Sequence, residues 1–255
     1  MKKIKYYLIF AFAFQLAFSQ QRPKPEETEV WEPEPRLVSP GYNNSAPSDA
    51  IVLFDGTNLS HWKSERNGGP AQWTINGDGS MTVKPGTGDI VTKEEHGSIQ
   101  LHIEWKSPIE ITGDGQGRGN SGIIFQRRYE VQVLDSYNNR TYSNGQAGSI
   151  YKQYIPLVNA MRPTGEWQVY DIVFNEPNFD ANGNMTAAGS FTVFHNGILI
   201  QNNIKILGTT EYIGPPKTGR DEMPGYGNNK KTERNLLLQD HSNHVSYRNI
   251  WMRKL

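Results

Sequence analysis

The sequence predicts an all-β protein in which two antiparallel sheets pack face to face as a jelly-roll sandwich. Short segments rich in Val, Ile, Tyr, Trp and Thr are separated by turn residues, and the 255 residues include 25 Gly and 15 Pro. Several segments alternate apolar and polar residues, as half-buried antiparallel strands do. No segment shows a sustained apolar period of 3.6 residues with caps, so we expect little helix.

The first 19 residues are typical of a secretory signal peptide. Three lysines within the first five residues precede an apolar stretch over 6–18, which is too short to span a bilayer comfortably. Ala17-Phe18-Ser19 fits a small-x-small cleavage site. We therefore expect export to the periplasm or the exterior, with no integral membrane association after cleavage; an uncleaved membrane anchor is the alternative.

Residues 20–48 are expected to form an extended linker. This segment contains six prolines and five glutamates, a composition that cannot build a packed core. The folded domain is therefore expected over residues 49–255.

The domain should contain about a dozen short strands, because apolar runs and turns follow one another throughout it. Two turns carry strong hairpin signals, Asn76-Gly77-Asp78-Gly79 and Asn196-Gly197. Regular alternation argues against a parallel α/β sheet, and the lack of a fixed repeat argues against a propeller or solenoid. The expected strands cover residues 51–54, 59–62, 73–75, 80–83, 98–105, 122–125, 129–134, 167–174, 190–195, 198–201, 234–239 and 245–252.

Composition excludes several classes of function. The 26 basic and 26 acidic residues give a net charge of zero, so there is no broad electrostatic case for a nucleic acid or an anionic membrane surface as partner. The absence of cysteine excludes disulfides, thiolate catalysis and cysteine metal sites.

The segment 128–133 is the most informative candidate for a ligand site. Arg128, Glu130 and Gln132 alternate with three apolar residues, so a cation, a carboxylate and an amide should lie in a row on one face of a strand. Such a face suits a hydroxyl-rich ligand such as a sugar, on whose ring an exposed Tyr137 or Tyr151 could stack. The alternative is an ordinary solvated sheet face.

Other polar residues at strand positions add to this candidate site. Glu104 is also the polar member of an alternating strand and, if both strands share a sheet, it should face a common cleft with Glu130. The segment 236–241 resembles an apolar strand that ends in Gln239, Asp240 and His241, where polar groups are well placed for binding or proton transfer. The alternative interpretation is that these three residues only form the hydrogen bonds of a turn.

Two other motifs are weak. The glycine-alternating run 113–119 lacks the Lys-Ser/Thr of a phosphate loop, and we expect a mobile loop at the rim of the sandwich. His241 and His244 are three residues apart, a spacing that recurs by chance and by itself gives little support for a zinc site.

Nine short motifs follow one another along residues 51–255. They are Leu53–Trp62, Glu104-Trp105, Gly119–Gly122, Tyr129–Ser136, Gly148–Tyr151, Gly165–Trp167, His195–Gly197, Leu238–His241 and Arg248–Trp251. In this order and spacing they resemble the family of 3-keto-disaccharide hydrolases, once catalogued as a domain of unknown function, DUF1080. Residues 217–231 diverge locally from the glycine-rich segment that usually precedes the eighth motif.

The resemblance implies a concanavalin-like jelly roll that acts on glycosides already oxidised at C3. A ketone at C3 acidifies the proton on C2, a base removes this proton, and the resulting enolate expels the group at C1. Water then adds to the enone, which gives net hydrolysis. This route needs a base, an acid for the leaving oxygen and an enolate stabiliser.

On this basis Glu130 and His241 are predicted as general base and acid, in an order that the sequence does not assign. Arg128 and Gln132 would hold substrate oxygens or the enolate. The remaining predicted substrate contacts are Glu104, Gln239 and Asp240.

No cofactor is predicted with certainty, but a divalent cation could replace Arg128 as enolate stabiliser. Glu104, Glu130, Asp240 and His241 include suitable oxygen and imidazole ligands for it. The alternative function is a noncatalytic, lectin-like carbohydrate-binding module, because fold does not fix function.

Overall fold

The computed structural model describes residues 23–225 and 234–255, so the predicted signal peptide lies outside the described residues. The chain divides into two units, Met1–Leu37 and Val38–Leu255. Every described residue of the first unit is exposed, and it contains one short 3-10 turn, η1 (Pro25–Glu27). Within the described ranges, no helix is both long enough and apolar enough to cross a bilayer.

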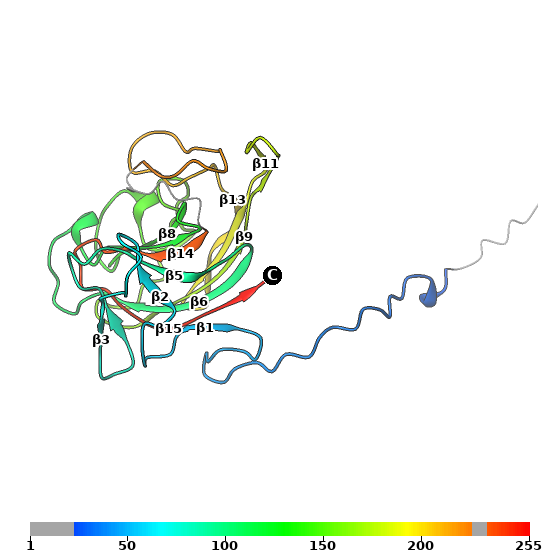
Figure 1. Ribbon diagram of the computed structural model, residues 1–255, viewed down its shortest axis with the longest axis horizontal. Coiled ribbons are helices and arrows are strands. Elements are labelled where there is room, and N and C mark those ends of the chain that lie inside the picture. The colour runs from blue at the N-terminus through cyan, green and yellow to red at the C-terminus, as the bar shows by residue number, and fades with distance from the viewer. Residues whose placement is uncertain (1–22, 226–233) are drawn as a thin grey trace, which may run out of the picture. The chain divides into compact units, whose positions relative to one another are not determined.

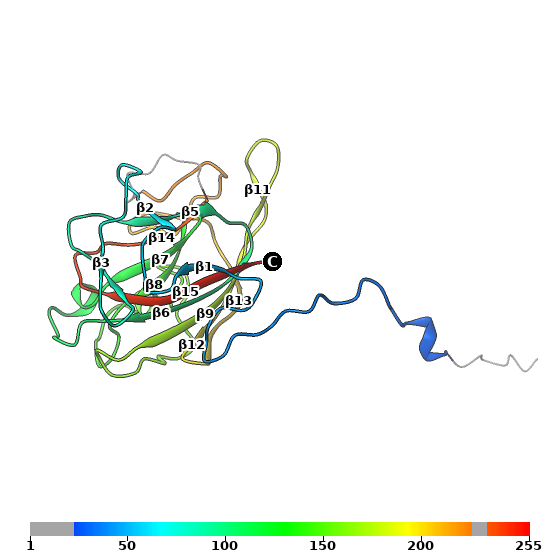
Figure 2. The same cartoon turned by 60° about the horizontal axis from the view of Figure 1, so that its bottom comes forward.

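The second unit is a two-sheet β-sandwich, which confirms the predicted all-β jelly-roll class (Figures 1 and 2). In the larger sheet the strand order is β13-β12-β9-β6-β15-β4-β3, and β1 also pairs with β15. Its strands are β1 (Ile51–Phe54), β3 (Thr74–Ile75), β4 (Met81–Thr82), β6 (Ile99–Lys106), β9 (Gln168–Asn175), β12 (Ser190–His195), β13 (Ile198–Lys205) and β15 (Ser246–Lys254).

The second sheet has five strands in the order β2-β5-β14-β7-β8. They are β2 (Trp62–Ser64), β5 (Ile90–Glu95), β14 (Asn235–Leu238), β7 (Ser121–Phe125) and β8 (Tyr129–Val133). A separate hairpin joins β10 (Asn178–Phe179) to β11 (Met185–Ala187), and two more 3-10 turns are η2 (Gly115–Gly117) and η3 (Ser143–Gly145).

One apolar core fills the space between the two sheets. In β6 the alternate residues Ile99, Leu101, Ile103 and Trp105 are fully buried in it, and from the other sheet β8 contributes Val131. The predicted apolar faces of these two strands are therefore confirmed, and the opposite side chains must point away from the core.

Not every strand follows the predicted pattern. Strand β5 was not predicted from the sequence. Its first three residues are all buried, as in a strand that is covered on both faces, so they do not show the alternation by which the other strands were identified. In the expected strand 59–62 only Trp62 is extended, and it begins β2. The hairpin over 73–83 is confirmed as β3 and β4.

The last strands of the chain occupy central positions in both sheets. Strand β14 lies between β5 and β7, and β15 lies between β6 and β4. The residues that follow β14 are thereby placed beside β7 and β8, although more than 100 residues of chain separate them.

Candidate functional site

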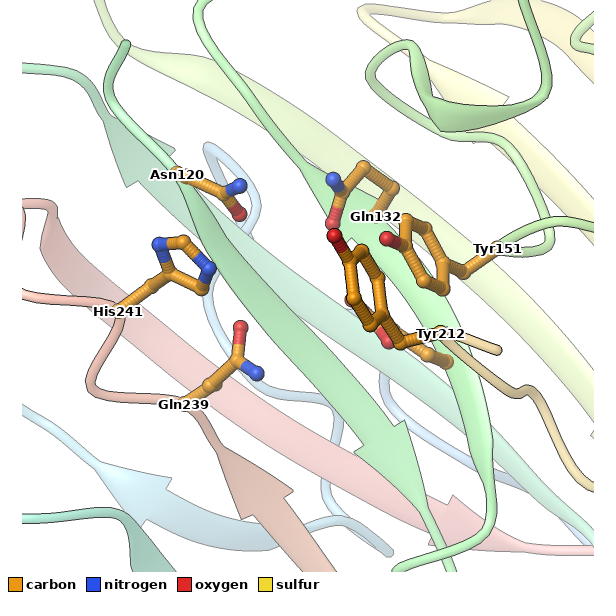
Figure 3. Close-up of a pocket in the computed structure, with 7 residues that line it drawn as sticks. Asn120, Gln132, Tyr151, Tyr212, Gln239 and His241 are labelled. Atoms are coloured by element: carbon orange, nitrogen blue, oxygen red, sulfur yellow. The ribbon is translucent and has the colours of Figure 1, made fainter. Parts of the chain in front are cut away.

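Three neighbouring strands, β14, β7 and β8, direct polar side chains to the outer face of the five-stranded sheet. Leu236 and Leu238 of β14 enter the core, so the alternate residues Gln239 and His241 lie on the opposite side. A cavity of about 280 Å³ lies over this face and is called the β8 pocket below. Its lining residues are Asn120, Glu130, Gln132, Tyr151, Tyr212, Gln239 and His241 (Figure 3).

Four of the predicted site residues are thus brought together, namely Glu130, Gln132, Gln239 and His241. In Figure 3, His241, Gln239 and Asn120 lie on one side of the cavity, and Gln132 lies on the other with two tyrosines. Glu130 and Gln132 are 3% and 1% exposed, so the alternative of an ordinary solvated sheet face is wrong for this strand.

Glu130 occupies space that only a glycine at position 122 leaves open. A Cβ built on Gly122 would lie 2.8 Å from Glu130 Oε1 and 3.2 Å from its Cδ. The backbone N–H of Glu130 donates to Thr210 Oγ1 at 3.1 Å, and its carbonyl accepts from the Tyr151 N–H at 3.1 Å. The backbone of Glu130 is therefore tied to two other segments, and its carboxylate lies against Gly122.

Gln132 lies within hydrogen-bond reach of Glu130. Its amide nitrogen donates to Gln116 Oε1 at 3.0 Å, and Gln116 in turn donates to the Gly145 carbonyl at 2.9 Å. With the Gln132 amide turned over, its nitrogen would donate to Glu130 Oε1 at 2.9 Å instead. In the first orientation Gln132 is bonded to Gln116, and in the second it is bonded to the Glu130 carboxylate and, at 3.0 Å, to the Ser121 carbonyl.

The turn after β14 carries His241 to the mouth of the pocket. Gln239 is still attached to β7, because its N–H donates to the Gly122 carbonyl at 3.1 Å and its carbonyl accepts from Ser121 Oγ at 2.6 Å. Asn243 Nδ2 then donates to the His241 carbonyl at 2.8 Å. The turn fixes the backbone while the imidazole remains exposed.

Two tyrosines complete the wall of the pocket. Tyr151, which was expected to be exposed and to stack on a sugar ring, is only 8% exposed, and its hydroxyl lies 2.8 Å from that of Tyr142. Burial raises the pKa of the Tyr151 phenol, so it stays protonated at neutral pH. Tyr212 is 57% exposed, and Lys152 Nζ lies 5.3 Å from its ring centroid.

Glu104 does not lie at this pocket. It belongs to β6 of the other sheet, so the expectation that it shares a cleft with Glu130 is wrong. Its carboxylate accepts from Arg248 Nε at 2.6 Å and from Asn249 Nδ2 at 2.9 Å. Burial alone would raise the pKa of Glu104, but hydrogen bonds from His102, Asn249 and Arg248 lower it to about 2.

Asp240 and Arg128 also lie away from the pocket. Asp240 Oδ2 accepts from the N–H groups of Gly86 and Gly88, both at 2.9 Å, so this carboxylate caps a turn. Arg128 directly precedes β8 and lines a separate cavity. Alternation identified the correct face of β8, whereas it could not show which positions along that face share a cavity.

Sequence reasoning missed Asn120 and Tyr212. Asn120 directly precedes β7 on the pocket face, and its Nδ2 donates to the Gln116 carbonyl at 2.7 Å. Asn120 and Ser121 are flanked by two glycines, and glycine in a strand often marks a place where a ligand or another backbone comes close. This pattern could have indicated that Asn120 lies at a site. Tyr212 belongs to a loop without strand periodicity, and no pattern in its sequence points to the pocket.

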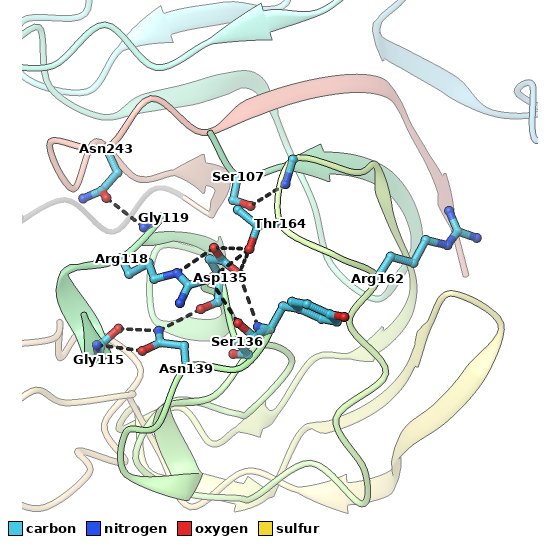
Figure 4. A network of polar contacts seen from close by, with 12 residues as sticks. Ser107, Gly115, Arg118, Gly119, Asp135, Ser136, Asn139, Arg162, Thr164 and Asn243 are labelled. Atoms are coloured by element: carbon cyan, nitrogen blue, oxygen red, sulfur yellow. Dashed lines mark hydrogen bonds and ion pairs between the residues drawn. The ribbon is translucent and has the colours of Figure 1, made fainter. Parts of the chain in front are cut away.

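The glycine-rich run 113–119 is tied to the loop that follows β8 (Figure 4). Gly115 donates to Asn139 Oδ1 at 2.8 Å and accepts from Asn139 Nδ2 at 2.9 Å. Arg118 Nε donates to Asp135 Oδ2 at 2.8 Å, and both side chains are largely buried. This loop is therefore anchored to its neighbour at several points.

The pocket offers one carboxylate, one imidazole, three amides and two phenols. A carboxylate and an imidazole facing one cavity can move a proton to and from a bound molecule, and the amides and phenols can hold its oxygens. Nowhere in residues 23–225 or 234–255 are three or more His, Asp or Glu side chains grouped so as to hold a metal ion.

Known proteins resemble both the fold and the sequence. A crystal structure of a candidate glycosyl hydrolase from Parabacteroides distasonis ATCC 8503 is 49% identical and has a TM-score of 0.83, covering 91% of this chain and 97% of its own. A second candidate glycosyl hydrolase from the same organism is 22% identical with a TM-score of 0.55, covering 81% and 94%, and supports the fold alone.

No curated protein matches this chain. A family model described as a 3-keto-alpha-glucoside-1,2-lyase-like domain matches residues 49–253, which is most of the chain. Together with the sandwich fold and the polar pocket on its outer face, this match shows that the chain belongs to the 3-keto-alpha-glucoside-1,2-lyase-like family of glycosidase-like, carbohydrate-active domains.

Proposed function

We propose that this protein is an exported enzyme that cleaves 3-keto-glycosides by C2 proton abstraction, elimination and hydration. The observation that carries the proposal is the meeting of Glu130 and His241 in one pocket whose other lining residues are amides and tyrosines. The family description and the signal-like N-terminal sequence support the substrate class and the export, respectively.

The chemistry requires two proton transfers on one bound ring. A base takes the proton from C2 next to the C3 ketone, and the electron pair passes through the enolate to expel the oxygen at C1. An acid supplies a proton to that oxygen, and water then adds to C1 of the enone. Glu130 and His241 are the proposed pair, because carboxylate and imidazole groups are common general acids and bases and both line this pocket.

The enolate oxygen needs hydrogen-bond donors, and Arg128 does not line this pocket. Gln239 and the protonated Tyr151 phenol are the donors proposed in its place, since preorganised donors stabilise developing negative charge. Gln132 would then orient Glu130 through the 2.9 Å approach of their side chains. Tyr212, exposed at the wall, would stack on the sugar or on the leaving group.

The test measures release of sugar from a 3-keto-glucoside by the purified protein, with and without added divalent cation. Glu130→Gln should lower kcat by about 100-fold or more, the usual contribution of general acid–base catalysis. Glu95→Gln, an exposed carboxylate on β5 of the same sheet, is the matched control and should leave kcat unchanged.

Deuterium exchange at C2 separates the two roles. The variant that lacks the base should lose both exchange and cleavage, whereas the variant that lacks the acid should retain exchange while cleavage slows. Glu130→Gln and His241→Asn are compared for this purpose. No release of sugar under any condition, combined with normal binding of the 3-keto-glucoside, would reject the enzyme and favour a carbohydrate-binding module.

A further inference from the structure

A second cavity lies at the start of β8 and shares no lining residue with the β8 pocket. Its volume is about 440 Å³, which is within the range of small-molecule sites. Three arginines line it, Arg128, Arg220 and Arg234, together with the carboxylates Glu176 and Asp221. We call it the Arg128 cavity.

Arg128 is the buried cation of this cavity, with 3% of its surface exposed. Its Nε donates to the Glu222 carbonyl at 3.2 Å and its Nη1 donates to the Gln126 carbonyl at 2.9 Å. Among the described residues no carboxylate forms an ion pair with Arg128, and its Nη2 has no hydrogen-bond acceptor. The Nη2 atom of the Arg128 guanidinium is therefore available to a ligand.

The two carboxylates of the cavity are already matched to other cations. Glu176 Oε2 accepts from Arg234 Nη1 and from Gln126 Nε2, both at 2.9 Å. Asp221 accepts from Arg220 at 2.9 and 3.1 Å. Three cations face two anions, so the lining carries one excess positive charge, and it resides on the buried arginine.

A buried charge without an opposite charge is unfavourable, and a bound anion would remove that cost. A guanidinium is well suited to carboxylate, sulfate and phosphate groups, and Nη2 of Arg128 can donate to an oxygen of such a group. Burial also lowers the pKa of Arg128, which is the effect expected of a cation that lacks a close counter-charge.

We propose that the Arg128 cavity binds an oxyanion, namely a carboxylate, sulfate or phosphate group. Arg128 would supply the buried contact, and Arg220 and Arg234 would supply weaker contacts at the entrance. The proposal stands on residues outside the β8 pocket and does not depend on the proposed reaction. Phe179 in the lining gives an apolar surface on which the body of a sugar acid could rest.

Calorimetric titration of the purified protein at constant ionic strength tests the site. The probes are inorganic sulfate, inorganic phosphate and D-glucuronate, and neutral D-glucose is the control ligand. We expect saturable binding of at least one anion with a stoichiometry of one. Glu130→Gln should bind the anion as the wild type does, which distinguishes this site from the β8 pocket.

Arg128→Gln should weaken anion binding by about tenfold or more, because it removes a charge-assisted contact. Arg220→Gln changes an exposed residue of the same cavity, should not disturb folding, and should weaken binding by a smaller factor. Arg66→Gln, an exposed arginine elsewhere, is the control.

The ligand series also identifies the source of the oxyanion. Tighter binding of D-glucuronate than of inorganic ions would assign the site to an acidic sugar, and the reverse would assign it to a free ion. The proposal is overturned if no anion binds saturably, or if Arg128→Gln and Arg220→Gln both bind as tightly as Arg66→Gln.

Discussion

Gly122 is the residue on which the position of the Glu130 carboxylate depends. A methyl group at this position would lie 2.8 Å from Glu130 Oε1, the far end of a flexible side chain, and φ at Gly122 is not in the left-handed region. Gly122→Ala should therefore displace the carboxylate rather than the backbone. We expect kcat to fall by tenfold or more while the free energy of unfolding changes by about 1 kcal/mol or less.

The matched control for this prediction is Gly77→Ala. A Cβ at Gly77 meets nothing within 4 Å, and this glycine lies in the turn between β3 and β4. Steady-state kinetics and urea unfolding of both variants check the prediction. Full activity in Gly122→Ala would mean that the carboxylate need not occupy its present place.

At the scale of single strands, the sequence predicted which face of a strand is buried better than it predicted the sheet to which the strand belongs. Alternation correctly placed Glu130 and Gln132 opposite the core in β8, because period two is imposed by the backbone itself. It also placed the Glu104 side chain away from the core, yet that strand belongs to the other sheet. Which strands become neighbours depends on long-range pairing, which local patterns do not encode.

The outer face of the larger sheet shows what Glu104 does instead. It joins His102 of the same strand, Asp171 of β9 and Arg248 of β15 in one cluster, with His102 Nδ1 2.7 Å from Asp171 Oδ1. Burial alone would lower the pKa of His102, but hydrogen bonds with Asp171 and Glu104 outweigh it and raise the pKa to about 9. The cluster therefore links three neighbouring strands through charge.

The raised pKa of His102 predicts a specific pH dependence of stability. A group whose pKa is higher in the folded state stabilises that state most below its unfolded value, about 6.5, and loses this contribution as the pH rises through about 9. The difference in unfolding free energy between wild type and His102→Gln should thus shrink over this range. Urea unfolding at several pH values measures it, and a constant or growing difference would contradict the assignment.

For the whole molecule, the central positions of β14 and β15 make folding depend on the end of the chain. Each sheet would lose an inner strand without them, and core residues such as Leu238 and Ile250 would be absent. A chain that ends at residue 233 should therefore not fold cooperatively, and its near-ultraviolet circular dichroism and urea transition should be lost.

Removal of the N-terminal unit, in contrast, should leave the stability of the domain unchanged. Residues 23–37 are exposed throughout, so a chain that begins at residue 38 should unfold at the same urea concentration as one that begins at residue 20.

A chain ending at residue 233 that retained a cooperative transition would show that the remaining strands can form both sheets alone. In that case the sandwich would form without β14, although Gln239 and His241 of the β8 pocket follow this strand directly. Formation of the pocket would then be a separate step from folding of the sandwich, which contradicts the expectation that both depend on β14.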